Sequence, residues 1–349
     1  MKKEFKVGNK VLDENSPAYI IAEMSANHGG SLDRALELVR VAKEIGADCI
    51  KIQTYTADTL TIDSNKEYFN IKKGTWTGEN LYELYKQAHT PWEWQKTLKE
   101  EADKIGIDFL STPYDFSSVD FLEELEVDFY KIASFELIDI PLVKYIASKK
   151  KPIIMSTGMA TLGEIEEAVN AIRDEGNEAL CLLRCSSAYP AASEDMKLKI
   201  MDLLSKTFDV KIGLSDHSMD SIGAIAAVAM GAKVIEKHFC LSRDIETADS
   251  SFSMEPEEFK KMVADIRQTE KVMGNTSFRL SEKEKGNRMF RKSIFVVKDI
   301  KQGEIYTEEN IRIIRPGYGL APKHYQEILG KKASKDIEWG EPIEWNMIE

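Results

Sequence analysis

The sequence predicts an α/β protein that consists of a (β/α)8 TIM barrel and a small β-rich C-terminal domain. Short apolar runs alternate with amphipathic segments eight times, up to about residue 275. Each apolar run also ends in polar residues. Because a barrel of this type builds its active site at the carboxyl ends of its strands, this second pattern favours closure into a barrel. An open, doubly wound sheet is the alternative fold.

The predicted elements follow one another in a regular order. The strands are expected at residues 19–25, 49–55, 108–114, 129–135, 152–158, 179–186, 210–217 and 234–239. The helices are expected at residues 32–45, 91–105, 119–125, 141–148, 162–175, 196–205, 221–230 and 256–273. The strand ends carry Glu23, Lys51, Gln53, Thr112, Lys131, Ser134, Ser156, Thr157, Ser186, Ser187, Ser215, His217, Glu236 and His238.

Two connections are longer than ordinary βα loops, which usually span roughly two to six residues. Residues 56–90 contain Trp76, Tyr82 and Tyr85, so we expect an ordered substrate lid or dimer contact there. Residues 241–255 follow the second strand-end histidine and contain Asp249.

The character of the chain changes after the barrel pattern. We expect a catalytic barrel over residues 1–280, a linker over 281–290 and a β-rich domain over 291–349. Within that last domain, Lys-Asp-Ile-x-x-Gly-Glu occurs at residues 298–304 and again at 335–341. The repeat predicts two hairpins with turn glycines at matching positions.

Composition excludes several classes of protein. The net charge of -12 argues against binding nucleic acid or an anionic membrane surface. No apolar run approaches the roughly 20 residues of a transmembrane helix, and the N-terminus does not resemble a signal peptide. The four cysteines lack metal-binding spacing and are expected to be buried, reduced thiols of a cytoplasmic protein.

The strongest candidate site is formed by His217 and His238. A strand, a helix and a strand over residues 210–239 place both histidines at the same end of neighbouring parallel strands, which lie about 4.8 Å apart. Two imidazoles at that spacing can share a divalent cation, and Asp216 and Glu236 stand beside them in the sequence. The alternative is that each histidine is an ordinary strand-end residue.

Lys51 and Lys131 place positive charges inside the mouth of the predicted barrel, where an unpaired ammonium group is costly. Either the two lysines form internal salt bridges with Glu23 and Glu236, or they face a carboxylate or phosphate. Ser134, Ser156 and Ser215 would add hydroxyl donors, and the Thr157-Gly158 step would add backbone N–H groups. This combination favours a small, highly charged anion beside a metal ion.

An ordered set of motifs resembles the sialic acid synthase family over nearly the whole chain. These are Ile-Ala-Glu-Met-Ser-Ala-Asn-His at 21–28, Lys-Ile-Gln-Thr-Tyr at 51–55, Ser-Thr-Pro at 111–113, Lys-Ile-Ala-Ser at 131–134, Ser-Thr-Gly-Met at 156–159, Ala-Tyr-Pro at 188–190, Gly-Leu-Ser-Asp-His at 213–217 and Glu-Lys-His-Phe at 236–239. The tail is similar to the antifreeze-like (SAF) domain of those enzymes, with Arg-Pro-Gly-Tyr-Gly at 315–319.

The resemblance implies a metal-dependent transferase that condenses phosphoenolpyruvate with an N-acetylated amino sugar. By position, phosphoenolpyruvate would be held by Lys51, Thr112, Lys131, Ser134, Ser156, Ser187 and Ser215, and the metal, expected to be Mn²⁺ with Mg²⁺ or Co²⁺ as alternatives, by His217 and His238. Glu23 and Glu236 would be catalytic, and Gln53, Tyr189 and Asp249 would line the sugar side. The family also implies a domain-swapped homodimer in which Arg315 acts in trans.

Three segments bear on the choice of sugar within the family. The Ser-Ala-Asn-His form at 25–28, the Gln-Thr-Tyr run at 53–55 and the Thr-Pro-Trp-Glu-Trp segment at 90–94 are most similar to members that make pseudaminic acid from 2,4-diacetamido-2,4,6-trideoxy-L-altrose. Synthesis of legionaminic or N-acetylneuraminic acid is the alternative with the same chemistry. A barrel metallohydrolase or aldolase and a non-catalytic sugar-binding protein are the alternatives from other classes.

Overall fold

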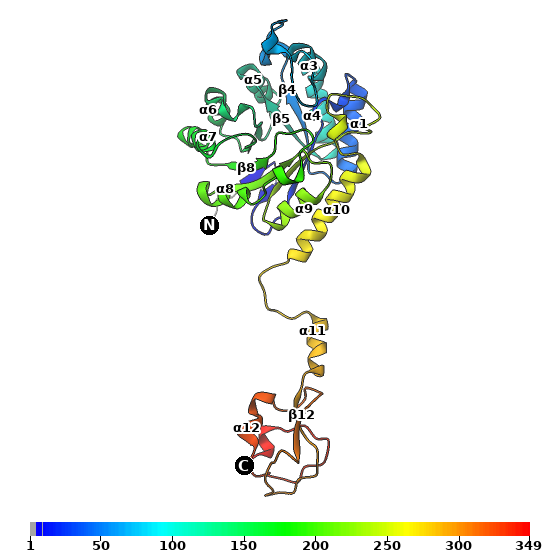
Figure 1. Cartoon of the computed structure of the whole chain (residues 1–349), viewed down its shortest axis with the longest axis vertical. Helices are drawn as coiled ribbons and strands as arrows, with labels where there is room; N and C mark the ends of the chain where they lie inside the picture. Colours follow the sequence, from blue (N-terminus) through cyan, green and yellow to red (C-terminus); the bar gives the residue numbers. More distant parts are fainter. Residues whose placement is uncertain (1–4, 9) are drawn as a thin grey trace. The chain divides into compact units, whose positions relative to one another are not determined.

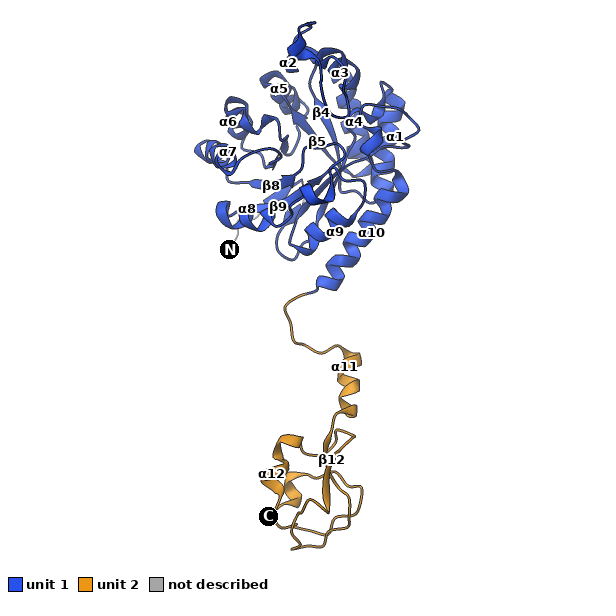
Figure 2. Ribbon diagram, in the orientation of Figure 1, with its two compact units in different colours: residues 1–274 blue, residues 275–349 orange. Residues whose placement is uncertain are grey.

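The computed structural model describes residues 5–8 and 10–349. The chain forms two compact units, Met1–Gly274 and Asn275–Glu349 (Figure 2). Each unit has its own hydrophobic core, so each is described by itself.

Unit 1 is the predicted (β/α)8 barrel (Figure 1). Its strands are β3 (Tyr19–Glu23), β4 (Cys49–Thr54), β5 (Asp108–Pro113), β6 (Tyr130–Ile132), β7 (Ile153–Ser156), β8 (Leu180–Cys185), β9 (Lys211–Asp216) and β10 (Val234–His238). They pair in parallel in the order β5-β4-β3-β10-β9-β8-β7-β6. The two end strands, β5 and β6, contact each other, so the barrel is nearly closed. The predicted fold class is therefore confirmed.

The eight expected helices surround the strands. They are α1 (Leu32–Glu44), α4 (Trp92–Ile105), α5 (Phe116–Glu124), α6 (Ile140–Ser148), α7 (Leu162–Asp174), α8 (Ile200–Phe208), α9 (Ile222–Ala229) and α10 (Pro256–Met273). Several begin at a side chain that caps the free N–H groups of the first turn, as Ser31 does for α1 and Thr161 does for α7. Their apolar faces pack on the outside of the sheet.

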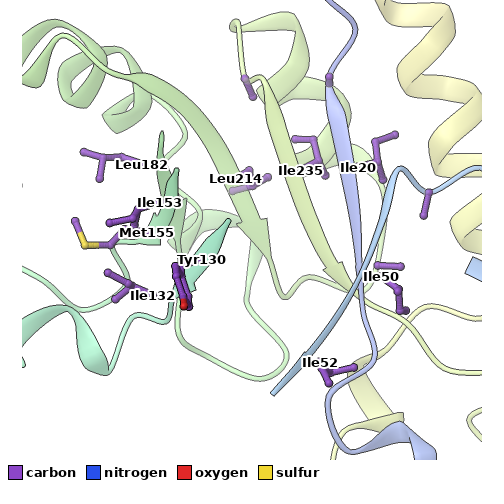
Figure 3. Close-up of a cluster of buried hydrophobic side chains, with 14 of the residues drawn as sticks. Ile20, Ile50, Ile52, Tyr130, Ile132, Ile153, Met155, Leu182, Leu214 and Ile235 are labelled. Carbon is purple, nitrogen blue, oxygen red and sulfur yellow. The ribbon is translucent and has the colours of Figure 1, made fainter. Parts of the chain in front are cut away.

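Successive strand residues alternate between the two faces of the barrel wall. Ile20, Ile50 and Ile235 point outward into the core beneath the helices (Figure 3). Ile21 and Cys49 belong to a separate, inner cluster. Further along the same strands the inner positions become polar. The interior is therefore apolar toward the amino ends of the strands and polar at their carboxyl ends.

A short hairpin that the sequence reading missed precedes the barrel. Strands β1 (Phe5–Val7) and β2 (Lys10–Leu12) are antiparallel and bury Phe5, Val7 and Leu12 against the inner cluster. Strands this short carry almost no periodic signal. The hairpin therefore contributes apolar side chains to the barrel interior, although its sequence shows no strand periodicity.

The excursion after β4 is ordered, as expected. It contains α2 (Ala57–Leu60), a 3-10 turn at Glu67–Phe69 and α3 (Leu81–Ala88). The indole N–H of Trp76 donates to the carbonyl of Ala248, 2.8 Å away, and the hydroxyl of Thr75 donates to the carbonyl of Tyr189. These bonds fix the excursion to two other loops of the barrel.

Unit 2 contains α11 (Glu282–Asn287), the antiparallel strands β11 (Ser293–Val296) and β12 (Ile311–Ile314), and α12 (Tyr325–Ile328). Both repeat glycines, Gly303 and Gly340, have positive φ as turn residues. The two repeat copies, however, pair with each other through Ile300 and Ile337, and the second copy is not part of a strand hairpin of its own. The expectation of two separate hairpins was therefore wrong.

Two further expectations concern the whole of the described chain. Across residues 5–8 and 10–349, no helix is long and apolar enough to cross a membrane. The four cysteines, Cys49, Cys181, Cys185 and Cys240, are free and buried, as expected.

Candidate active site

A cavity of about 430 Å³ lies at the carboxyl ends of the barrel strands, a size typical of small-molecule sites. Twelve of the fifteen residues singled out from the sequence line it: Glu23, Lys51, Gln53, Lys131, Ser134, Ser156, Tyr189, Ser215, His217, Glu236, His238 and Asp249. The inner face supplies most of them because, on strands such as β4, β9 and β10, they occupy alternate positions that point into the barrel.

Two lysines and two glutamates form a buried charge network in this cavity. The Nζ of Lys51 lies 2.7 Å from Glu23 Oε2 and 3.0 Å from Glu236 Oε1. The Nζ of Lys131 lies 3.6 Å from the same oxygen of Glu236. The salt bridges that the sequence offered as an alternative are thus present, but they lie in the wall of the cavity, where the ammonium groups can also reach a ligand.

The charge network shifts the pKa values of its members. Burial lowers the pKa of Lys51 to about 8, although Glu236 opposes this shift. Burial alone would raise the pKa of Glu236, but Lys131 and Lys51 lower it to about 2. Glu236 is therefore ionised at neutral pH and partly neutralises the positive charge of the two lysines.

Hydroxyl groups surround the lysines. Lys131 Nζ donates to Ser156 Oγ over 2.7 Å, and Ser215 Oγ donates to Glu236 Oε1 over 3.1 Å. The backbone N–H of Gly158 donates to Ser134 Oγ over 3.0 Å. A Cβ at Gly158 would lie 2.1 Å from Ser187 Oγ, so only glycine allows this close approach of backbone and hydroxyls. The arrangement offers ammonium, hydroxyl and backbone donors to an anion.

The two histidines lie beside this donor cluster. Their ring centroids are 5.3 Å apart. Nδ1 of His217 lies 2.8 Å from the carbonyl of Ser186, which fixes Nδ1 as the protonated nitrogen and leaves Nε2 with a free lone pair. Nδ1 of His238 has no hydrogen-bond partner in the described structure and lies 3.8 Å from Asp249 Oδ2. Burial lowers the pKa of His238, which keeps its imidazole neutral.

These features fit a divalent metal ion. His217 has one ring nitrogen held by a carbonyl, which is the usual arrangement of a metal-binding histidine, and His238 is a neutral imidazole with an unpartnered nitrogen. In residues 5–8 and 10–349 there is no cluster of three or more His, Cys, Asp or Glu side chains with metal-binding geometry. The protein ligands would therefore be His217 and His238, and substrate or water oxygens would complete the coordination.

Apart from Glu23 Oε2 and Asp216 Oδ2, which form ion pairs with lysines, four buried polar side-chain atoms of the barrel have no hydrogen-bond partner in the part of the chain that the structure describes. They are Thr112 Oγ1, Glu136 Oε2, Glu236 Oε2 and His238 Nδ1. Leaving one such atom unsatisfied costs about 1–3 kcal/mol, and native proteins have few of them. Glu136, Glu236 and His238 line the cavity, where a bound ligand would satisfy their unpartnered atoms.

Three of the predicted residues lie outside the cavity lining. Thr112 is buried inside the barrel and adjoins Gln53 in the strand register. Ser187 lies against Gly158, as Ser134 does. Arg315 follows β12 in unit 2, where its side chain is exposed. The roles expected for these three residues stay predictions.

The structure corrects the expected position of Asp216. This aspartate is the last residue of β9, between Ser215 and His217, and its side chain points away from the cavity. Its Oδ2 lies 3.0 Å from Lys237 Nζ in a buried ion pair. The expectation that Asp216 stands in the site beside the histidines was wrong.

Sequence reasoning missed a set of residues that line the open side of the cavity. Glu136 follows β6, and its carboxyl group faces Tyr85 and Tyr114. Burial raises the pKa of Glu136 to about 7. The sequence did contain a signal for Glu136. It lies two residues after Ser134, beyond the end of the strand that contains Lys131. Residues of α2 and α3 were missed because their apolar pattern is that of ordinary packing.

Comparison with protein families decides the relationship of the chain. The NeuB family model matches residues 38–278, which are most of the barrel, and the SAF domain model matches residues 291–349. The chain belongs to the NeuB family.

Characterised relatives and a solved structure agree with membership of the NeuB family. A pseudaminic acid synthase of Campylobacter jejuni subsp. jejuni (strain 81-176) is 49% identical over 97% of this chain and 98% of its own length. An N,N'-diacetyllegionaminic acid synthase of the same species is 40% identical over 93% of this chain and 98% of its own length. The crystal structure of an N-acetylneuraminic acid synthetase from Leptospira borgpetersenii, in complex with citrate, is 32% identical, with a TM-score of 0.74, over 82% of this chain and 95% of that one.

Proposed function

We propose that the protein is a pseudaminic acid synthase. It condenses phosphoenolpyruvate with 2,4-diacetamido-2,4,6-trideoxy-L-altrose and water, giving pseudaminic acid and phosphate. The observation that carries this proposal is that Lys51, Lys131 and three serines line the same cavity as His217 and His238. The full-length similarity to a pseudaminic acid synthase, higher than that to a legionaminic acid synthase, supports the choice of sugar.

Phosphoenolpyruvate carries a carboxylate and a phosphate, and the donor cluster matches both groups. Lys51 and Lys131 supply the positive charge, and Ser134, Ser156 and Ser215 supply neutral donors. We place Thr112 and Ser187 in the same binding site, as the family resemblance implies. The lysines are already desolvated and held in position by Glu23 and Glu236. A ligand that carries more negative charge than these two carboxylates can therefore compete with them for the lysines.

The reaction forms one carbon–carbon bond. A divalent metal held by His217 and His238, proposed to be Mn²⁺, would supply Lewis acidity at the aldehyde of the open-chain sugar. C3 of phosphoenolpyruvate attacks that aldehyde carbon, and the positive character that develops at C2 is captured by water. The tetrahedral product then loses phosphate by cleavage of the bond between C2 and the bridging oxygen, which leaves the 2-keto acid.

Two glutamates are placed to assist these steps. Glu236 lies beside both lysines, so its ionised carboxylate can stabilise positive character at C2 or accept a proton from the attacking water. Glu23 contacts Lys51 and also accepts the backbone N–H of Ser25, which holds it at the sugar side of the cavity. We propose that Glu23 orients the sugar or transfers its protons.

The sugar would lie between the buried charge network of lysines and glutamates and the loops that follow the strands. Gln53 donates to Ser25 Oγ, and the ring of Tyr189 lies tilted against that of His217, with the ring centroids 4.3 Å apart. Asp249 is buried and adjoins His238. These three side chains offer an amide, a phenol and a carboxylate to hydroxyl and acetamido groups.

We further propose that the active enzyme is a homodimer in the cytoplasm, and that Arg315 of one copy contacts the sugar bound by the other. The match of residues 291–349 to the SAF domain supports this proposal, as does the exposure of Arg315. The free cysteines support the location.

An isotope experiment separates this condensation from simple hydrolysis of phosphoenolpyruvate. With ¹⁸O at the bridging oxygen and with the sugar present, the proposal predicts that the released phosphate retains the label. Phosphate without the label would show cleavage at phosphorus, which would favour the hydrolase alternative. No phosphate release under any condition would favour the binding-protein alternative.

A further inference from the structure

The excursion between β4 and α4 presents an apolar surface to the cavity. Leu81, Leu84, Tyr85 and Ala88 of α3 occupy positions i, i+3, i+4 and i+7, which share one face of a helix, and all four line the cavity. Leu60 of α2 and Ile71 line it as well. We call Leu60, Ile71, Leu81, Leu84, Tyr85 and Ala88 the apolar wall.

The apolar face of α3 does not pack into a core. No residue of α3 is buried, and within the described chain none of the six apolar-wall residues belongs to a hydrophobic core cluster. A face with this pattern normally covers a protein core. Here it faces the space where a substrate must lie, so a ligand with apolar groups would remove it from water.

The apolar wall is held in place from several sides. Trp76 bonds to Ala248 and packs against the rings of Tyr189 and Phe252, at 5.6 and 6.2 Å. The ring of Tyr85 contacts that of Tyr55 at 5.8 Å. Because the excursion is anchored to the barrel, the apolar wall is preorganised and can discriminate between ligands.

The chemistry of the proposed reaction orients the sugar. Its aldehyde carbon must meet phosphoenolpyruvate beside His217 and His238, which lie at the strand ends. The other end of the open chain then extends outward, toward the excursion that follows β4. In the proposed acceptor that end carries a deoxygenated C6 methyl and a second acetamido methyl, where N-acetylmannosamine carries hydroxyl groups.

We propose that the apolar wall makes the enzyme prefer a 6-deoxy amino sugar to its 6-hydroxy counterpart, by receiving the deoxy C6 methyl end of the acceptor. This inference rests on the proposed condensation and extends it by naming the surface that discriminates between 6-deoxy and 6-hydroxy acceptors. A hydroxyl at C6 would be desolvated against Leu81 and Leu84 without a partner, and this penalises the hydroxylated analogue.

The test compares two acceptors that differ by one oxygen: the 6-deoxy diacetamido sugar and its 6-hydroxy analogue. Leu84→Asn should lower kcat/KM for the deoxy sugar by roughly tenfold, and should shift the ratio of the two kcat/KM values toward the hydroxy sugar. The KM for phosphoenolpyruvate should not change. Leu84→Met, which keeps the volume and the apolar character, should retain the wild-type ratio.

Ile62→Asn is the matched control, because Ile62 lies in the same excursion, is 61% exposed and is not part of the cavity lining. It should leave both kcat/KM values unchanged. An unchanged ratio in Leu84→Asn, or an equal loss with both sugars, would overturn the role of the apolar wall while leaving the condensation intact. If the wild-type protein condenses neither sugar with phosphoenolpyruvate, the proposed function itself fails, and the inference fails with it.

Discussion

The imidazole rings of His217 and His238 lie with their centroids 5.3 Å apart, one just beyond the end of β9 and the other at the end of β10. One of them donates to the Ser186 carbonyl, and the other leaves Nδ1 without a hydrogen-bond partner among the residues described. This pair is the basis of the proposed metal site.

Replacing either histidine should abolish metal binding without unfolding the barrel. We expect His217→Ala and His238→Ala to weaken Mn²⁺ binding by about 100-fold or more, because each removes one of only two protein ligands. The free Mn²⁺ signal in electron paramagnetic resonance titrations measures the affinity, and circular dichroism checks the fold. His89→Ala is the control, since the His89 ring lies 2.9 Å from the Lys86 carbonyl and does not line the cavity. Unaltered affinity in both histidine variants would refute the metal assignment.

Lys131 should act on phosphoenolpyruvate rather than on the sugar. Lys131→Met removes a cation next to Ser156 and Glu236, so we expect the KM for phosphoenolpyruvate to rise by about tenfold or more, with little change in the KM for the sugar. Steady-state kinetics with each substrate varied in turn provides both constants. Lys86→Met, at an exposed lysine of α3, is the control. A change confined to the sugar KM would contradict the assignment.

Glu136 should make the stability of the fold depend on pH. Burial raises its pKa from 4.5 to about 7, so between these values the folded protein keeps a proton that the unfolded chain releases. Its contribution to the free energy of unfolding therefore falls as pH rises from about 4.5 to 7. Glu136→Gln cannot titrate, so its stability relative to wild type should increase across that window by about 1–3 kcal/mol.

Urea unfolding at pH 5 and pH 8 measures this difference. Glu83→Gln, at an exposed glutamate, should show the same difference from wild type at both values. A Glu136→Gln difference that is also independent of pH would show that Glu136 has an ordinary pKa.

Arg315 tests the proposed contribution of the second unit. Arg315→Ala should raise the KM for the sugar or lower kcat, with a smaller effect on the KM for phosphoenolpyruvate, because the proposal places the guanidinium against the sugar.

Mixing Arg315→Ala with His217→Ala should restore part of the activity if the residue acts in trans, since some dimers then contain one intact site. Absence of recovery in the mixture would argue against action in trans, and unaltered kinetics of Arg315→Ala would remove the residue from the site.

Much of the fold and of the cavity followed from two periodicities in the sequence. The alternation of strands and helices predicted the barrel, and the i, i+2 spacing within strands placed Ser215 with His217 and Glu236 with His238 on one face. The same spacing already implied that Asp216 points outward. We nevertheless expected it near the metal because it is adjacent in sequence, and its ion pair with Lys237 shows that strand geometry decides which residues share a face.

Other features could not be predicted because their cause is tertiary. The apolar residues of α3 have the spacing of a helix that packs on a core, and only the structure shows that they face the cavity. Glu136 lies beyond the predicted strand, where the direction of a side chain depends on the loop. The pairing of Ile300 with Ile337 joins two repeat copies that the sequence could only show to be alike.

The central claim is tested most directly by measuring phosphate release from phosphoenolpyruvate in the presence of Mn²⁺ with different acceptors. The acceptors are 2,4-diacetamido-2,4,6-trideoxy-L-altrose, the legionaminic acid precursor, N-acetylmannosamine and a control without sugar. We predict release that depends on the first sugar. Release with another sugar instead would keep the reaction and change the substrate, whereas the absence of any sugar-dependent release would contradict the proposed condensation.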